Sequence, residues 1–219
     1  GQGFTTLLPL KEVGLVQFAP SLGELMQLLA ATPRWIIGHS AGAALGAQYA
    51  LNADKLPEGM LCINAAFNPF GSLAAPLFSK TAKWFARSHW LPRVLASPSL
   101  RWRGTGSMLA DTGSAVDPLM SRCYDTLLGN PDHIAGTLRM MAGWDLPPLL
   151  RCLPSLQMPV WLAAAEGDRT IPPERSTSVA NDLPLARAVR IPGLGHLAHE
   201  ENPEIFEELF QEMRTKTAA

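Results

Sequence analysis

The sequence predicts an α/β protein in which a mostly parallel sheet is flanked by helices and interrupted by a helical insertion. Three observations support this fold class. Short apolar runs alternate with segments of helical periodicity, which is typical of a parallel sheet covered on both faces. The first apolar run leads directly into a glycine-flanked serine and an alanine-rich segment. The long stretch from 67 to 144 then breaks the alternation.

The individual elements can be assigned from these patterns in chain order. A first helix is expected over residues 22–31, ending near Pro33, because proline disfavours helix at the residue before it. Residues 34–37 are a short apolar run of the kind typical of a buried parallel strand. Residues 43–51 are rich in alanine and favour a helix. The apolar stripe of the first helix is expected to consist of Leu22, Leu25, Met26 and Leu29. Three more strands are expected at 60–64, 160–164 and 188–191, and a last helix after Asn202 and Pro203 with Ile205, Phe206, Leu209, Phe210 and Met213 on one side.

The stretch between the second and third predicted strands is rich in Pro, Gly, Trp and Met. It is longer than a crossover connection requires. We therefore expect residues 67–145 to form a helical cap, with residues 1–66 and 146–219 forming the core. Ordinary crossover helices are the alternative interpretation.

Composition limits the class of protein. The 219 residues are 47% hydrophobic and carry a net charge of −1, which fits one domain with an insertion and provides no field to attract nucleic acid. Cys62, Cys123 and Cys152 lack paired spacing, so we expect buried, reduced thiols in a cytoplasmic protein, with no metal or cofactor. No apolar run approaches the roughly 18 residues of a membrane-spanning helix. The first residues also lack the pattern of a signal peptide.

Residues 38–42 read Gly-His-Ser-Ala-Gly, the G-x-S-x-G pattern of a sharp strand-to-helix turn. Such a turn exposes the oxygen of Ser40, which needs a base to become a nucleophile. The following helix N-terminus carries partial positive charge, and the amide of Ala41 is the expected donor to an oxyanion. A glycine-rich turn packed for steric reasons is the structural alternative.

A base and an acid are expected after the third and fourth strands, where parallel strands end at one edge of the sheet. His196 is the expected base, and Asp168 is expected to hold its tautomer and stabilise the imidazolium. Glu166 is the alternative acid, although it lies closer to the strand. His199 is the alternative base, although it lies past the glycine-rich turn. His39 is expected to line the pocket or to pack.

These segments together resemble the α/β-hydrolase superfamily. Within it, the chain is similar to the magnesium-chelatase accessory proteins of bacteriochlorophyll synthesis (the BchO type). Generic hydrolases would share the serine and histidine segments but hardly those of the cap. The segments that carry the narrower resemblance are 40–44, 64–70, 104–107, 130–136, 140–146 and 193–201.

The resemblance implies a role in tetrapyrrole pigment synthesis around magnesium insertion. It implies an α/β-hydrolase fold, a tetrapyrrole as small-molecule substrate and contact with magnesium chelatase. His39, Phe67 and Trp144 are the expected substrate-binding residues. Residues 1–5 resemble the loop after the fourth strand of such hydrolases. The expectation is then that the first strands, and the loop giving half of the oxyanion hole, are missing.

Basic and aromatic residues gather in the expected cap, with no acidic residue between Glu58 and Asp111. A peripheral contact with an anionic membrane surface and an aromatic pocket for porphyrin carboxylates are two interpretations. A solvated basic face over core aromatics is the third. The residues are Lys80, Lys83, Arg87, Arg93, Arg101 and Arg103, with Phe70, Phe78, Trp84, Phe85, Trp90 and Trp102.

Three functions remain open from the sequence. The first is a hydrolase-fold protein with a Ser-His-Asp triad that acts on or handles a tetrapyrrole. The second is a generic carboxylic-ester hydrolase. The third is a non-catalytic accessory protein that binds the pigment or the chelatase.

Overall fold

The computed structural model describes residues 2–67 and 85–218, with the backbone alone for residues 101–103 and 218. The chain forms two compact units. The helical unit consists of residues 1–17, 69–111 and 116–145, and the core unit of residues 18–68, 112–115 and 146–219. The short segment 112–115 therefore belongs to the core, although the chain on both sides of it belongs to the helical unit.

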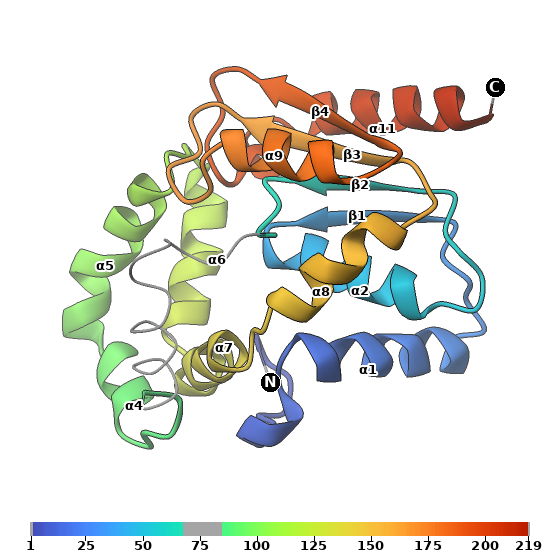
Figure 1. Cartoon of the computed structure of the whole chain (residues 1–219). Coiled ribbons are helices and arrows are strands. Elements are labelled where there is room, and N and C mark those ends of the chain that lie inside the picture. The colour runs from blue at the N-terminus through green and yellow to red at the C-terminus, as the bar shows by residue number, and fades with distance from the viewer. Residues whose placement is uncertain (1, 68–84, 219) are drawn as a thin grey trace. The chain divides into compact units, whose positions relative to one another are not determined.

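The core unit contains a four-stranded, fully parallel sheet in the order β1-β2-β3-β4 (Figure 1). In its register, Trp35 lies opposite Gly59 and Met60 opposite Val160. This confirms the predicted α/β class with its mostly parallel sheet. The strands are β1 (Trp35–His39), β2 (Gly59–Ile63), β3 (Val160–Ala165) and β4 (Ala186–Ile191).

Helices cover both faces of this sheet. On one face, Phe206 and Met213 of the last helix pack with Leu61 and Trp161. On the other face a Cβ at Gly46 would lie 2.7 Å from Ile36 and 2.9 Å from Met60, so glycine allows this helix to approach the strands closely. The helices of this part of the chain are α1 (Leu15–Leu28), α2 (Ala41–Asn52), α8 (Pro147–Cys152), α9 (Glu174–Asp182), α10 (Ala198–Glu201) and α11 (Pro203–Ala218), with a 3₁₀ turn at Leu153–Ser155.

The first helix differs from its prediction. It starts at Leu15, includes Pro20 and ends at Leu28, well before Pro33. Its end is a left-handed turn, in which Ala30 has φ 49° and the amide of Ala31 donates to Met26 O at 2.9 Å. The buried and half-buried face is Leu15, Ala19, Leu22 and Met26, whereas Leu25 and Leu29 are exposed. The predicted stripe was wrong at these two positions, because starting the helix at Leu15 sets a different inward face.

The helical unit is built from short helices with strong start signals. Asp117 and Asn130 each precede a proline and accept hydrogen bonds from backbone amides of the first turn. Proline at the first helical position has no amide hydrogen to leave unpaired, so the pair is a strong helix start. The elements are a 3₁₀ turn at Leu10–Glu12, α4 (Leu91–Leu95), α5 (Pro98–Asp111), α6 (Pro118–Leu128) and α7 (Pro131–Ala142).

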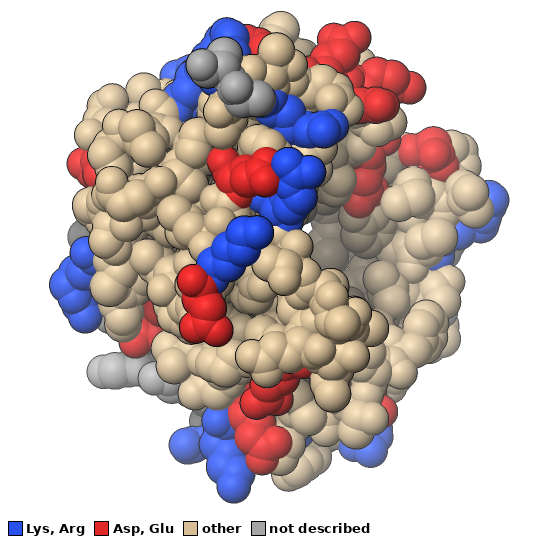
Figure 2. All heavy atoms as spheres, turned by 90° about the vertical axis from the view of Figure 1, so that its right-hand side faces the viewer, with Lys and Arg blue, Asp and Glu red and all other residues tan. Residues whose placement is uncertain are grey.

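Most side chains of the predicted basic and aromatic cluster are not described. Phe70, Phe78, Lys80, Lys83 and Trp84 fall in 68–84, and the side chains at 101–103 are not described either. On the face shown in Figure 2, several of the described Lys and Arg side chains lie beside Asp or Glu side chains.

The three cysteines are free thiols, but only Cys62 is buried. The prediction of buried thiols was therefore wrong for Cys123 and Cys152, which lie on exposed helix positions.

Candidate active site

Ser40 lies in a strained turn between β1 and α2. Its backbone has φ 51° and ψ −119°, a conformation that non-glycine residues rarely adopt and that functional turns retain. The end of the neighbouring strand holds it, because the Ser40 amide donates to Ile63 O at 2.9 Å and Ser40 O accepts from the Ala66 amide at 3.1 Å. The turn thus presents the hydroxyl at the carboxyl edge of the sheet.

The two glycines of the G-x-S-x-G pattern have different roles. A Cβ at Gly38 would lie 2.7 Å from the Cα of Ala43, so the strand can approach the helix only without a side chain there. At Gly42 a Cβ would meet no atom within 4 Å among the described residues. Ala41 is the first residue of α2, so its amide is one of the helix-terminal donors without an intrahelical acceptor.

A hydrogen-bonded chain links Ser40 to a histidine and an acid. His196 Nε2 lies 3.1 Å from Ser40 Oγ, and His196 Nδ1 lies 2.8 Å from Asp168 Oδ2. The other carboxylate oxygen of Asp168 accepts from the amides of Thr170 (2.7 Å) and Ile171 (2.8 Å). The carboxylate can only accept, so Nδ1 carries the proton in the neutral ring and Nε2 is free to accept the serine proton. This arrangement can perform nucleophilic chemistry.

The alternative acid and base are placed differently. Glu166 is exposed just after β3, whereas Asp168 is 6% and His196 7% exposed. His199 stacks on His39 with ring centroids 4.3 Å apart, and its Nδ1 has no hydrogen-bond partner among the described residues. The structure therefore brings Ser40 together with Asp168 and His196.

His39 supports the loop that carries His196, residues 192–197 between β4 and α10, which we call the histidine loop. Its Nε2 lies 2.8 Å from the backbone carbonyl of His196, and a carbonyl only accepts, so Nε2 carries the proton. The two rings also pack with centroids 4.8 Å apart. Burial, and then the neighbouring rings of His199 and His196, lower the pKa of His39 to about 4. His39 is thus neutral near pH 7 and acts as a hydrogen-bond donor to the loop.

The lowered pKa of His39 predicts acid sensitivity. The unfolded chain binds a proton at His39 near pH 6.5 and the folded chain only near pH 4, so stability falls as pH drops between these values. The His39 contribution lost by pH 4.5 should be about 2 kcal/mol. We expect His39→Gln, which keeps a donor, to lose less unfolding free energy than wild type between pH 7.5 and 4.5 in urea titrations. His89→Gln, which removes an exposed histidine, is the control, and parallel curves for all three proteins would contradict the prediction.

Asn64 is a residue of the site whose role the sequence analysis missed. It is 2% exposed, has φ 46° and directly follows β2. Its Nδ2 donates to the carbonyls of Gly195 (3.0 Å) and His196 (2.9 Å), and its Oδ1 accepts from the Ala165 amide at 2.8 Å. One side chain thus ties the ends of β2 and β3 to the histidine loop. The available signal was a polar residue ending a fully apolar strand.

The predicted substrate-binding residues have distinct environments. His39 is half-buried against the two histidines, while Phe67 is 2% exposed in the core unit. Trp144 belongs to the helical unit, and its indole Nε1 is buried without a hydrogen-bond partner among the described residues. Whether these three side chains bind a substrate stays a prediction.

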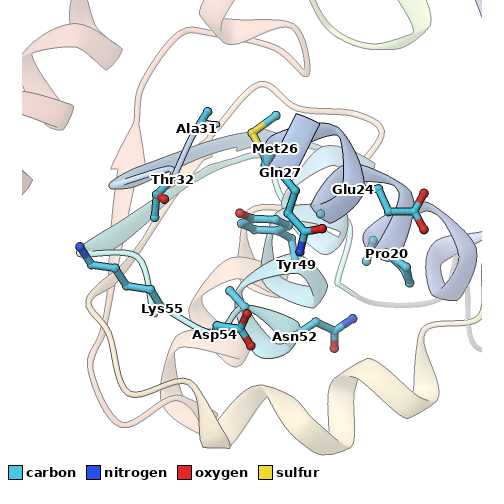
Figure 3. Close-up of a pocket in the computed structure, with 13 residues that line it drawn as sticks. Pro20, Glu24, Met26, Gln27, Ala31, Thr32, Tyr49, Asn52, Asp54 and Lys55 are labelled. Carbon is cyan, nitrogen blue, oxygen red and sulfur yellow. The ribbon is translucent and has the colours of Figure 1, made fainter. Parts of the chain in front are cut away.

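Each unit also contains a cavity of its own. A groove of about 390 Å³ lies in the core unit beside Thr32 and Lys55, which precede β1 and β2, and so at the opposite strand ends from Ser40. In Figure 3, Gln27 reaches this groove from α1 and Tyr49 from α2. The helical unit contains an open apolar pocket of about 570 Å³. Its lining includes Leu100, Met108, Leu127, Ile134 and Leu138.

Neither a metal-binding cluster nor a membrane-spanning helix is present in the described residues. In residues 2–67 and 85–218, no three His, Cys, Asp or Glu side chains are arranged to hold a metal ion. Within the same ranges, none of the helices has the length and hydropathy needed to cross a bilayer.

Comparison with known proteins gives consistent similarities. A sequence model of the alpha/beta hydrolase family matches residues 1–209. The magnesium-chelatase 30 kDa subunit of Rhodobacter capsulatus is 37% identical over 200 residues, which cover 91% of this chain and 69% of that protein. A thermophilic esterase from Thermogutta terrifontis has a TM-score of 0.71 at 20% identity, covering 100% of this chain and 78% of the esterase. An esterase from Exiguobacterium antarcticum has a TM-score of 0.72 at 15% identity, covering 98% and 78%. These two structural similarities concern the fold alone.

Proposed function

Because the chain belongs to the α/β hydrolase family, we propose that Ser40, His196 and Asp168 form the catalytic triad of a serine hydrolase acting on carboxylic esters. The observation that carries this proposal is the hydrogen-bonded chain from Ser40 Oγ through His196 to Asp168 Oδ2. It starts at a serine whose positive φ matches a nucleophile elbow.

The proposed reaction proceeds in two halves. His196 Nε2 takes the proton of Ser40 as the oxygen attacks the ester carbonyl, and Asp168 stabilises the imidazolium. The C–O bond to the alcohol breaks, and the alcohol leaves with the proton from His196. Water then attacks the acyl-serine in the same way and releases the acid. The amide of Ala41 would donate to the oxyanion, and losing one such donor typically costs about 10²–10³ in rate.

We assign this activity to magnesium insertion in (bacterio)chlorophyll biosynthesis, with a tetrapyrrole as the substrate or ligand. The 37% identity to a protein named as a magnesium-chelatase subunit supports the role and a contact with the chelatase. The apolar pocket of the helical unit supports a largely apolar ligand. In this proposal residues 67–145 act as the cap, His39, Phe67 and Trp144 contact the ligand, and no cofactor takes part.

A second function is suggested by the name of the relative. That name describes a subunit and no hydrolytic activity. In the second function, the protein binds the tetrapyrrole or the chelatase without catalysis. A generic ester hydrolase is the remaining alternative, and its hallmark would be turnover of simple esters without tetrapyrrole binding.

Reaction with a fluorophosphonate probe tests the proposed catalysis. We expect the full chain to be labelled at Ser40, because only an activated serine reacts readily with such probes. Ser40→Ala should lose the label, whereas Ser178→Ala, on an exposed position of α9, should keep it. Mass spectrometry of the labelled protein identifies the modified residue.

The outcomes separate the functions. A folded wild-type chain that remains unlabelled rejects the hydrolase and favours the binding role. Titration with magnesium protoporphyrin, followed by its absorbance, separates a tetrapyrrole-specific protein from a generic esterase. An unchanged spectrum together with labelling at Ser40 would favour the generic esterase.

A further inference from the structure

The segment Thr112–Ala115 joins α5 to α6 and makes hydrogen bonds to both loops that carry the acid and the histidine. The carbonyl of Thr112 accepts from the amide of Arg169 at 3.2 Å and from that of His196 at 3.1 Å. Arg169 directly follows Asp168. A single carbonyl therefore links the backbones on which the acid and the histidine are mounted.

The same segment completes the hydrogen bonding of the histidine loop. Three successive amides of this loop, those of Gly195, His196 and Leu197, belong to residues outside the strands and helices. Each of them therefore needs an acceptor from another part of the chain. Gly195 N donates to Glu201 Oε1 at 2.8 Å, His196 N to Thr112 O, and Leu197 N to Ser114 Oγ at 2.7 Å. Two of the three acceptors thus come from the segment 112–115.

The third acceptor is itself tied to the segment. Glu201 accepts from Gly195 with one carboxylate oxygen and from the Ala115 amide with the other, at 3.1 Å. The carboxylate therefore bridges the histidine loop and the last residue of the segment. Charge-assisted bonds of this kind are stronger than neutral ones.

The segment packs closely against both loops. Gly113 has φ 80°, and a Cβ there would lie 2.1 Å from the carbonyl oxygen of Gly167, in the loop that carries Asp168. A Cβ at Gly195 would lie 2.3 Å from the carbonyl carbon of Gly113. Backbone thus meets backbone on both sides, so a displacement of the segment displaces both loops.

We propose that Thr112–Ala115 is a positioning element that fixes His196 relative to Asp168. The inference rests on the proposed function, since it gives the two side chains their catalytic meaning.

The test replaces Ser114, whose hydroxyl accepts from the Leu197 amide of the histidine loop. Ser114→Ala leaves the Leu197 amide without its acceptor, so amide exchange at 195–197 should accelerate about tenfold while strand β2 stays unchanged. The downfield proton resonance of His196 Nδ1–H, which donates to Asp168, should shift. Ser114→Thr keeps the hydroxyl and should restore the wild-type spectrum, and Ser121→Ala in α6 is the matched control.

An unshifted resonance in Ser114→Ala would overturn the positioning role. Both readouts are independent of Ser40 reactivity. A wild-type protein that fails to react with fluorophosphonate therefore counts against the proposed function alone.

Discussion

Replacing His196 by alanine is expected to slow the reaction of Ser40 with a simple aryl ester about 10⁴-fold or more. His196 is the group within hydrogen-bond distance of Ser40 Oγ, at 3.1 Å, and it is held by Asp168 at 2.8 Å. Without a base at this place the serine hydroxyl stays protonated during attack and is a poor nucleophile. Stopped-flow release of the aryl alcohol, with wild type and variant at equal concentration, measures the loss.

Two further variants make this prediction specific. Asp168→Asn removes the carboxylate that sets the tautomer of His196, and it should cost about 10⁴-fold. His199→Ala is the matched control, because His199 stacks on His39 and makes no hydrogen bond to Ser40 in the described structure. Its effect should stay below about tenfold, the level expected for a residue outside the reacting chain. A larger loss for His199→Ala than for His196→Ala would assign the base to His199.

The sequence was sufficient to predict which strands exist and that Ser40, Asp168 and His196 follow them at one edge of the sheet. The inner strands β2 and β3 are short apolar runs buried along their whole length, as a parallel strand covered on both faces requires, whereas the outer strands β1 and β4 are only partly buried. Ser40, Asp168 and His196 each come shortly after one of these strands. Because parallel strands end at the same edge of a sheet, their meeting could be expected from order alone.

The supports of the site could not be predicted in the same way. Asn64 and Ser114 act through bonds to backbone atoms of the histidine loop, more than eighty residues away. Such bonds depend on where an irregular loop leaves its amides and carbonyls unpaired, which periodicity does not encode. The limits of α1 escaped prediction for a related reason. Its end is set by a left-handed turn at Ala30, a residue without any turn preference.

Asn64→Asp is the change for which we expect the largest loss of stability. The substitution is nearly isosteric, but it replaces the Nδ2 donor by a second acceptor facing the carbonyls of Gly195 and His196. At 2% exposure neither water nor a cation can compensate. An unpaired buried charge is costlier than an unpaired neutral group, so the free energy of unfolding should fall by about 3 kcal/mol or more at pH 8.

This loss should depend on pH in the sense opposite to that of His39. The carbonyl dipoles and burial favour the protonated form of the new carboxyl group and raise its pKa in the folded state. Once protonated, the group can donate to one of the two carbonyls. The folded state then binds more protons than the unfolded state, so the difference from wild type should grow as pH rises from 5 to 8.

Urea unfolding at pH 5 and pH 8 tests both parts of the Asn64 prediction. Asn181→Asp, the same substitution at an exposed position of α9, should cost less than about 1 kcal/mol at either pH. If the two variants are equally stable, the two hydrogen bonds that Asn64 Nδ2 donates do not hold the histidine loop. If Asn64→Asp is destabilised equally at both pH values, the damage is loss of packing and the donor role of Nδ2 is wrong. A deficit that shrinks at pH 5 is expected only when the missing donor is what the histidine loop requires.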